Sequence, residues 1–197
     1  MLLPVLPVRA EAPAVASPGA WVEPETASVI ETLRTRLLAG PSATAVLEAW
    51  CAERGLSEDP RLVARRVSAA DKPLTAIQRQ RLGLGPDEAV RYRRVRLTCG
   101  AYVLSEADNW YVPSRLTPGM NATLDTTETP FGRVVRLLGP TRRNLGVRTI
   151  WEPKAGYPPA LTEALFAVEA VLSTAEGVPF CEVAETYTGA VLAQGRP

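Results

Sequence analysis

Short segments in which apolar and polar residues alternate fill most of the second half of the chain, and they limit the fold more than any other feature. In Val90–Cys99, the side chains of Val95 and Leu97 fall on one side of an extended strand and Arg94 falls on the other. Further strands are expected at Leu62–Val67, Tyr102–Glu106, Trp110–Val112, Thr141–Trp151, Phe166–Ser173 and Pro179–Ala190. The last two segments are separated by a short turn, which predicts a β-hairpin.

Helical spacing dominates the first part of the chain instead. Apolar residues recur three or four positions apart in Ser28–Leu38, and Gly40-Pro41 ends that helix. A second helix is expected from Ser42 to about Gly55, which makes a helical hairpin. Shorter helices are expected at Thr75–Leu82, Leu116–Leu124 and Phe131–Leu138. Helices followed by strands that pair in antiparallel fashion predict an α+β fold, an antiparallel β-sheet with flanking helices and an N-terminal helical hairpin.

The 197 residues are enough for one domain, which we assign to residues 26–197. Residues 1–25 are rich in proline and alanine and are interpreted as a disordered leader. The alternative is a remnant signal peptide, because Met1–Val8 is apolar and small residues follow it. The first interpretation predicts a cytoplasmic protein and the second an exported, periplasmic one. No apolar run is long enough to span a bilayer.

The charged residues exclude several classes of function. A net charge of +1 gives no reason to expect nucleic acid as a partner. The chain has no histidine, so any proton transfer falls to a carboxylate, a tyrosine, a cysteine or a lysine. Nearly all the positive charge is arginine, whose planar guanidinium binds carboxylates through two hydrogen bonds. This favours a small organic acid as the partner, and the alternative is that the arginine content reflects a GC-rich genome. We further expect a monomer.

Three cysteines, Cys51, Cys99 and Cys181, lack the spacing of a metal site. We interpret them as buried thiols in a reducing compartment. One disulfide together with one free thiol is the alternative.

Three features are candidates for chemistry. Glu185 alternates with Cys181 and Val183, so it is a carboxyl in an apolar setting if that face is buried, and such a group acts as a general acid or holds a hydroxyl. Arg94 lies in mid-strand and can bind a carboxylate, although a solvated arginine-rich face is the alternative. Phe131 follows a proline in Thr129–Gly132, a helix-start signature that leaves backbone N–H groups free for an anion.

These features occur in an order that resembles the chorismate lyase family: R-x-x-L-x-C in Arg94–Cys99, then V-P, T-P-F-G-R, T-R, G-x-P and a strand glutamate. The resemblance covers about Val90–Leu192. It implies a lyase that converts chorismate to 4-hydroxybenzoate and pyruvate for ubiquinone biosynthesis, without a cofactor. It also implies a pocket in which Arg94 and Phe131 hold the ring carboxylate.

By the same resemblance Glu185, or Glu182 in another register, faces the ring hydroxyl, and Arg94 and Glu185 are the catalytic residues. The chain departs from the family at Asn109, where the family has an arginine; Arg115, Arg133 and Arg142 are left as residues that take its place. The same fold serves as the effector-sensing domain of certain transcription regulators. A non-catalytic protein that binds an aromatic acid is therefore the alternative function, and a structural protein with an aromatic-filled core is a third.

Overall fold

A computed structural model describes residues 23–153 and 157–195 of the chain. Nearly all of the segment interpreted as a leader lies outside these ranges. Its last residues do not, because the first helix already begins at Glu23. The described helix therefore starts within the segment that the sequence assigned to the leader, and a proline at position 24 is compatible with the first turn of a helix.

An antiparallel sheet forms the centre of the described structure. Its six strands lie in the order β1-β2-β3-β6-β5-β4, and every neighbouring pair is antiparallel. The bounds are β1 Val63–Arg66, β2 Arg91–Cys99, β3 Tyr102–Tyr111, β4 Thr141–Thr149, β5 Ala164–Ser173 and β6 Pro179–Thr188. This confirms the predicted α+β class, including the hairpin of β5 and β6.

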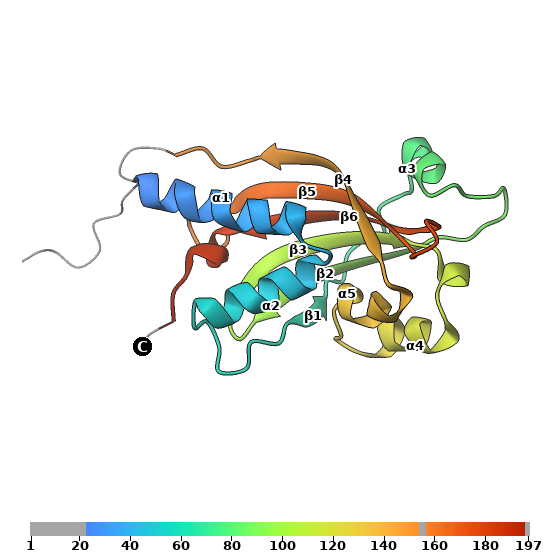
Figure 1. Cartoon of the computed structure of the whole chain (residues 1–197), viewed down its shortest axis with the longest axis horizontal. Coiled ribbons are helices and arrows are strands. Elements are labelled where there is room, and N and C mark those ends of the chain that lie inside the picture. The colour runs from blue at the N-terminus through green and yellow to red at the C-terminus, as the bar shows by residue number, and fades with distance from the viewer. Residues whose placement is uncertain (1–22, 154–156, 196–197) are drawn as a thin grey trace, which may run out of the picture.

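Most of the helices lie on one face of this sheet (Figure 1). They are α1 Glu23–Ala39, α2 Ala43–Glu53, α3 Ala76–Arg81, α4 Pro118–Thr126 and α5 Phe131–Val134, with short 3-10 turns at η1 Pro113–Arg115, η2 Val135–Leu138 and η3 Gly189–Leu192. The predicted N-terminal hairpin is confirmed as α1 and α2. None of the described helices combines the length and the apolar content that crossing a membrane requires.

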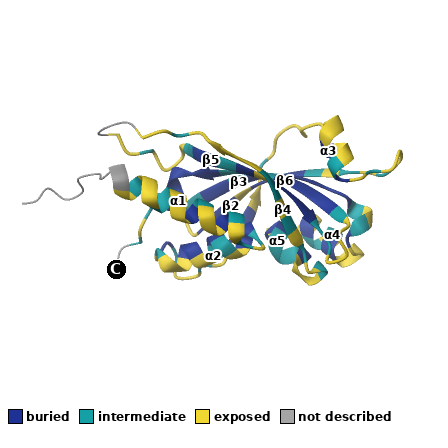
Figure 2. Ribbon diagram, turned by 45° about the horizontal axis from the view of Figure 1, so that its top comes forward, coloured by how far each residue is buried: buried dark blue, intermediate teal, exposed yellow. Residues whose placement is uncertain are grey.

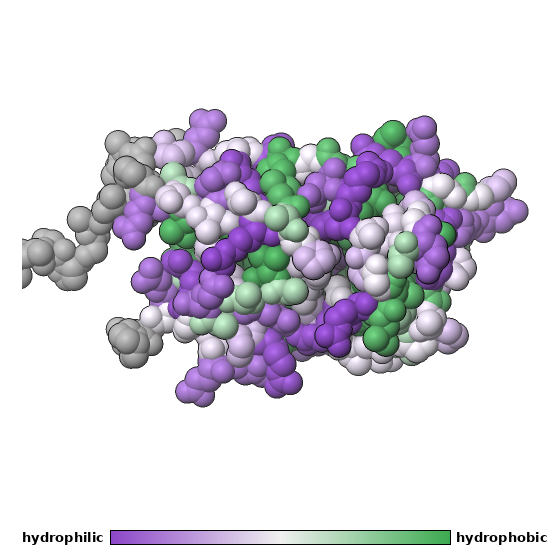
Figure 3. All heavy atoms as spheres, in the orientation of Figure 1, coloured by the Kyte–Doolittle hydropathy of each residue, from purple (hydrophilic) through white to green (hydrophobic). Residues whose placement is uncertain are grey.

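The core lies between this helical layer and the sheet. Leu33 and Leu37 of α1 and Leu47 of α2 are completely buried. They belong to one cluster with Val95 and Leu97 of β2, on the apolar face of that strand. Figure 2 shows the buried strands beneath helices whose outward faces are exposed. Over the helices, Figure 3 shows hydrophilic side chains interspersed with apolar ones. Burial of this apolar face is the main force that fixes the register of the strands.

The segment between β1 and β2 contacts the opposite face of the sheet. Thr75 caps α3, and its side chain and that of Gln78 form a reciprocal capping box. The indole N–H of Trp110 donates to the carbonyl of Lys72 at 3.1 Å. Arg81 at the end of α3 pairs with the buried Glu182 of β6 at 3.1 Å. Polar contacts therefore help to hold this segment to the sheet, and Leu82 at its end is completely buried.

Two expectations from the sequence were wrong. Tyr102–Glu106 and Trp110–Val112 are not separate strands, because β3 is continuous from Tyr102 to Tyr111 between its two neighbours. Cys51 and Cys99 are not free thiols: they form a disulfide that links the end of α2 to the end of β2, with Cα atoms 6.2 Å apart. Cys181 is free and buried, so the alternative of one disulfide and one thiol is the correct one.

Candidate functional site

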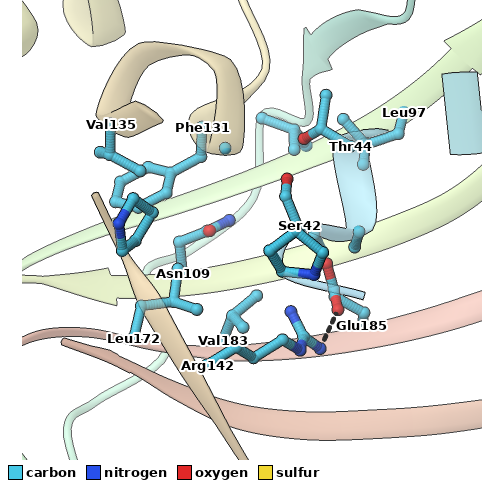
Figure 4. Close-up of a pocket in the computed structure, with 16 residues that line it drawn as sticks. Ser42, Thr44, Leu97, Asn109, Phe131, Val135, Arg142, Leu172, Val183 and Glu185 are labelled. Atoms are coloured by element: carbon cyan, nitrogen blue, oxygen red, sulfur yellow. Dashed lines mark hydrogen bonds and ion pairs between the residues drawn. The ribbon is translucent and has the colours of Figure 1, made fainter. Parts of the chain in front are cut away.

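A small cavity of about 40 Å³ lies between the sheet and the helical layer (Figure 4). Its floor comes from strands β2 to β6, and its roof comes from the α1–α2 connection and from α5. The lining residues are Pro41, Ser42, Ala43, Thr44, Val95, Leu97, Ala107, Asn109, Phe131, Gly132, Val135, Pro140, Arg142, Leu172, Val183 and Glu185. Most of this lining is apolar, so its few polar groups decide what the cavity can bind.

An ion pair forms one end of the floor. Arg142 of β4 donates from Nη2 to Oε2 of Glu185 on β6 across 2.7 Å, and the two side chains are only 4% and 6% exposed. Burial lowers the pKa of Arg142, but the attraction of Glu185, of Tyr187 and of Cys181, together with the hydrogen bond to Glu185, outweighs this effect, and the net shift is upward. Removing either side chain would leave the other charge buried without a partner, which strongly destabilises the folded protein.

Two further side chains hold this pair in place. Asn144, two residues along β4, accepts from Nε of Arg142 at 3.1 Å and donates to the carbonyl of Leu38 in α1 at 2.9 Å. Tyr187 donates from its hydroxyl to Oε2 of Glu185 at 3.1 Å. Burial, followed by the charge of Glu185, raises the pKa of Tyr187 well above its ordinary value, so its hydroxyl remains a donor.

The roof consists of two helix starts that touch each other. Ser42 is the N-cap of α2, but its side chain makes no capping hydrogen bond, so the first N–H groups of α2 lack a side-chain cap among the described residues. Gly132 in the first turn of α5 faces this start. A Cβ atom at Gly132 would lie 2.6 Å from Oγ of Ser42 and 2.8 Å from Oγ1 of Thr44. The close approach of α2 and α5 therefore requires glycine at this position.

Arg93 lies beside the cavity on the same face of the sheet as Val95. Its backbone carbonyl accepts from Nδ2 of Asn109 at 3.4 Å, and its Nη2 donates to the carbonyl of Thr129 at 3.3 Å. The residue is 4% exposed, and within the described structure Nε and Nη1 have no hydrogen-bond partner. Burial, and then repulsion from Arg66, lowers the pKa of Arg93 to about 10, so it stays charged at neutral pH.

Arg94 does not share a site with Glu185, contrary to the prediction. It pairs with Glu106 at 2.7 Å and lies 3.8 Å from Asp108 on the opposite face of the sheet. Successive residues of a strand point to opposite faces, so the next residue after Arg93 is directed away from the cavity.

The other predicted residues have different outcomes. Phe131 and Glu185 both line the cavity. Glu182, the register alternative to Glu185, lies on the face that contacts α3 and binds Arg81. Of the three arginines considered in place of the one missing at position 109, Arg142 is the cavity residue.

Arg115 and Arg133 do not line the cavity, and each forms an ion pair with a glutamate outside it. Arg115 binds Glu88 and the carbonyl groups of Leu82 and Gly83. Arg133 pairs with Glu48 of α2.

Sequence reasoning missed two functional candidates. Arg93, Val95 and Leu97 occupy alternate positions of one strand, so their side chains share a face. This spacing alone would have placed Arg93 on the buried face. Asn144 gave no such signal, because its contacts with Arg142 and α1 depend on tertiary structure. Among the described residues, no group of three or more histidine, cysteine, aspartate or glutamate side chains comes together to bind a metal.

Similar folds occur among solved structures. PhnF from Mycobacterium smegmatis is 17% identical, with a TM-score of 0.52 over 86% of this chain and 83% of that chain. The effector domain of PhnF is 18% identical, with a TM-score of 0.51 over 76% of this chain and 89% of that chain. A GntR-family transcriptional regulator from Enterococcus faecalis has a TM-score of 0.45 at 15% identity, over 68% of this chain and 99% of that one. The first two similarities show that this chain has the fold of an effector domain.

No protein-family model matches the sequence. A curated relative does: the uncharacterized protein y4mC of Sinorhizobium fredii is 44% identical over 182 residues, which cover 85% of this chain and 77% of the relative. Identity at this level over most of both chains implies a common fold and a common ancestor. The chain belongs to the same protein family as y4mC of Sinorhizobium fredii.

Proposed function

We propose that this protein binds a small aromatic or cyclic carboxylate in the cavity between the sheet and helices α2 and α5, and that it holds the ligand without converting it. One observation carries the proposal. Arg93 is a buried guanidinium with two nitrogen atoms, Nε and Nη1, that have no partner in the described structure, and it lies beside an apolar cavity.

A bound anion would remove the cost of burying this charge. A charged group taken out of water is destabilised by several kcal/mol unless it gains an opposite charge and hydrogen bonds. The start of α2, which lacks a side-chain cap, adds backbone N–H groups on the roof. A carboxylate between Arg93 and the roof would accept from both.

The rest of the cavity suits a ring with a hydroxyl group. Val95, Phe131 and Val183 supply apolar walls, and Glu185 supplies an acceptor. In the strand register Arg93 lies opposite Asn109, and Glu185 lies opposite the next inward residue of β3, Ala107. Arg93 and Glu185 are therefore two strands apart across the sheet and two residues apart along the strands. Standard strand spacings put their Cα atoms about 12 Å apart. Side chains converging from both ends leave room for a molecule about the length of 4-hydroxybenzoate.

Binding requires the cavity to enlarge. Its volume of about 40 Å³ admits a few water molecules, whereas sites for small ligands usually exceed about 300 Å³. The roof is the part that can move, because α2 and α5 are separate helices that meet at Gly132. A ligand that separates α2 from α5 would change the conformation of the protein when it binds. A sensor requires such a change. The effector-domain fold supports this proposal.

Conversion of chorismate to 4-hydroxybenzoate and pyruvate is the second candidate. Its support is the resemblance to chorismate lyases and the presence of Glu185 in the cavity. Two observations favour binding over this chemistry. Glu185 is engaged by Arg142 and Tyr187, and the neutral Asn109 lines the wall where the lyase family has an arginine.

Calorimetric titration with 4-hydroxybenzoate tests the proposal, and Arg93→Met and Arg94→Met provide a matched pair of variants. The wild type and Arg94→Met should bind, whereas Arg93→Met should lose at least about tenfold in affinity, because charge-assisted hydrogen bonds are lost. Equal affinity in both variants would refute the role of Arg93. Incubation with chorismate separates the two candidates, since pyruvate release above the rate without protein would establish the lyase.

A further inference from the structure

The charges of the ionisable residues that line the cavity add up to zero. Arg142 and Glu185 are the only ionisable side chains among its lining residues, and they form a direct ion pair. Asn109, which also lines the wall, is neutral. Arg93 beside the cavity is therefore the single cation in this region whose guanidinium lacks an anionic partner among the described residues.

The other cations near Arg93 add little to this balance. Arg66 and Arg91 line a hollow with Arg93 on the surface. Both share Asp125, at 3.8 and 2.7 Å, and their side chains are about half exposed. Solvent and Asp125 therefore screen their charges much more strongly than the buried charge of Arg93 is screened.

We propose that the site selects ligands with one negative charge and rejects dianions, and that the Arg142–Glu185 pair determines this selectivity. The inference rests on the proposed function and names the class of its ligand. A single carboxylate neutralises Arg93. A second carboxylate at the far end would meet Glu185, whose charge is already directed at Arg142, and like charges at a buried contact strongly oppose binding. A neutral hydroxyl at that end donates to Glu185 instead.

Two para-substituted benzoates with the same ring test this selectivity. 4-Hydroxybenzoate carries one charge at neutral pH, and terephthalate replaces its hydroxyl with a second carboxylate. The wild type should bind 4-hydroxybenzoate at least about tenfold more tightly than terephthalate. Glu185→Gln leaves Arg142 without its partner, which raises the positive charge of the site from one to two, and it should reverse the preference. The double variant Arg142→Met/Glu185→Gln returns the charge to one and should lose the preference for terephthalate that Glu185→Gln creates.

The outcomes separate this inference from the proposed function. If the wild type binds neither acid, the proposed function fails and the inference fails with it. If it binds both acids with equal affinity, or if Glu185→Gln keeps the wild-type preference, the selectivity proposal is overturned while carboxylate binding stands. The wild-type comparison needs no substitution, so the proposal stays testable even if Glu185→Gln does not fold.

Discussion

Arg142 on β4 and Glu185 on β6 form a 2.7 Å ion pair across the intervening strand β5, with both side chains almost fully buried. The pair joins an edge strand to the centre of the sheet. Arg142→Met should therefore lower the free energy of unfolding by about 3–5 kcal/mol, because it leaves Glu185 charged and buried without a partner. Urea denaturation measures this change.

The double variant Arg142→Met/Glu185→Gln should recover much of the loss, since no buried charge remains. The exposed pair of Arg61 and Asp59 is the control: Arg61→Met should leave the free energy of unfolding nearly unchanged. Similar losses for Arg142→Met and Arg61→Met would contradict the importance of burial.

Arg93 should favour ligand binding without stabilising the ligand-free protein. Its guanidinium is buried with two unpartnered nitrogen atoms, so Arg93→Met should leave the stability of the ligand-free protein unchanged or raise it by about 1 kcal/mol or more. Arg94→Met removes a pair with Glu106 whose side chains are 32% and 28% exposed, and it should cost less than about 1 kcal/mol. Thermal unfolding without ligand compares the two variants. A large loss of stability in Arg93→Met would show that Arg93 has a structural partner.

Gly132→Ala should force α2 and α5 apart. The added Cβ would meet Ser42 and Thr44 at distances below 3.0 Å, which predicts a loss of about 1–3 kcal/mol. Removing the hydroxyl in Ser42→Ala/Gly132→Ala should restore part of this loss. Gly119→Ala in α4 is the control, because a Cβ there meets nothing within 4 Å and alanine favours a helix. Equal effects of the two alanines would argue against close contact at the roof.

The disulfide between Cys51 and Cys99 should make a large contribution to stability. Its sequence separation of 48 corresponds to about 4 kcal/mol in the chain-entropy account. Reduction, or the double variant Cys51→Ala/Cys99→Ala, should lower the midpoint of urea unfolding accordingly. Denatured but unreduced protein should expose one reactive thiol, that of Cys181. Titration of three thiols under those conditions would mean that the disulfide is absent.

Tyr187 should make the protein sensitive to alkaline pH. Its pKa is raised by burial and by Glu185, so its contribution to stability is complete below the ordinary tyrosine value near 10 and is lost as pH rises through the higher folded-state pKa. Between about pH 9 and 11, stability should fall more steeply in the wild type than in Tyr187→Phe. The exposed Tyr157 is the control, since Tyr157→Phe should keep the wild-type slope. Parallel slopes in all three proteins would contradict the buried hydroxyl.

The sequence by itself determined the fold class and one wall of the site. Alternation with Cys181 and Val183 put Glu185 on the same face as these residues and predicted its burial if that face is the inner one, and the structure buries it there. Helical spacing similarly predicted α1 and α2. These predictions succeed because they depend on residues close together in sequence, whose periodicity reports which face is buried.

Only the tertiary structure decided which arginine lines the cavity and on which face of the sheet the others lie. Arg93 and Arg94 differ by one position, and one residue along a strand exchanges its two faces. Arg142 meets Glu185 through sheet order, and Cys51 meets Cys99 through the docking of α2 on β2. Such contacts join residues far apart in sequence, so they follow from how the elements pack and not from any local pattern.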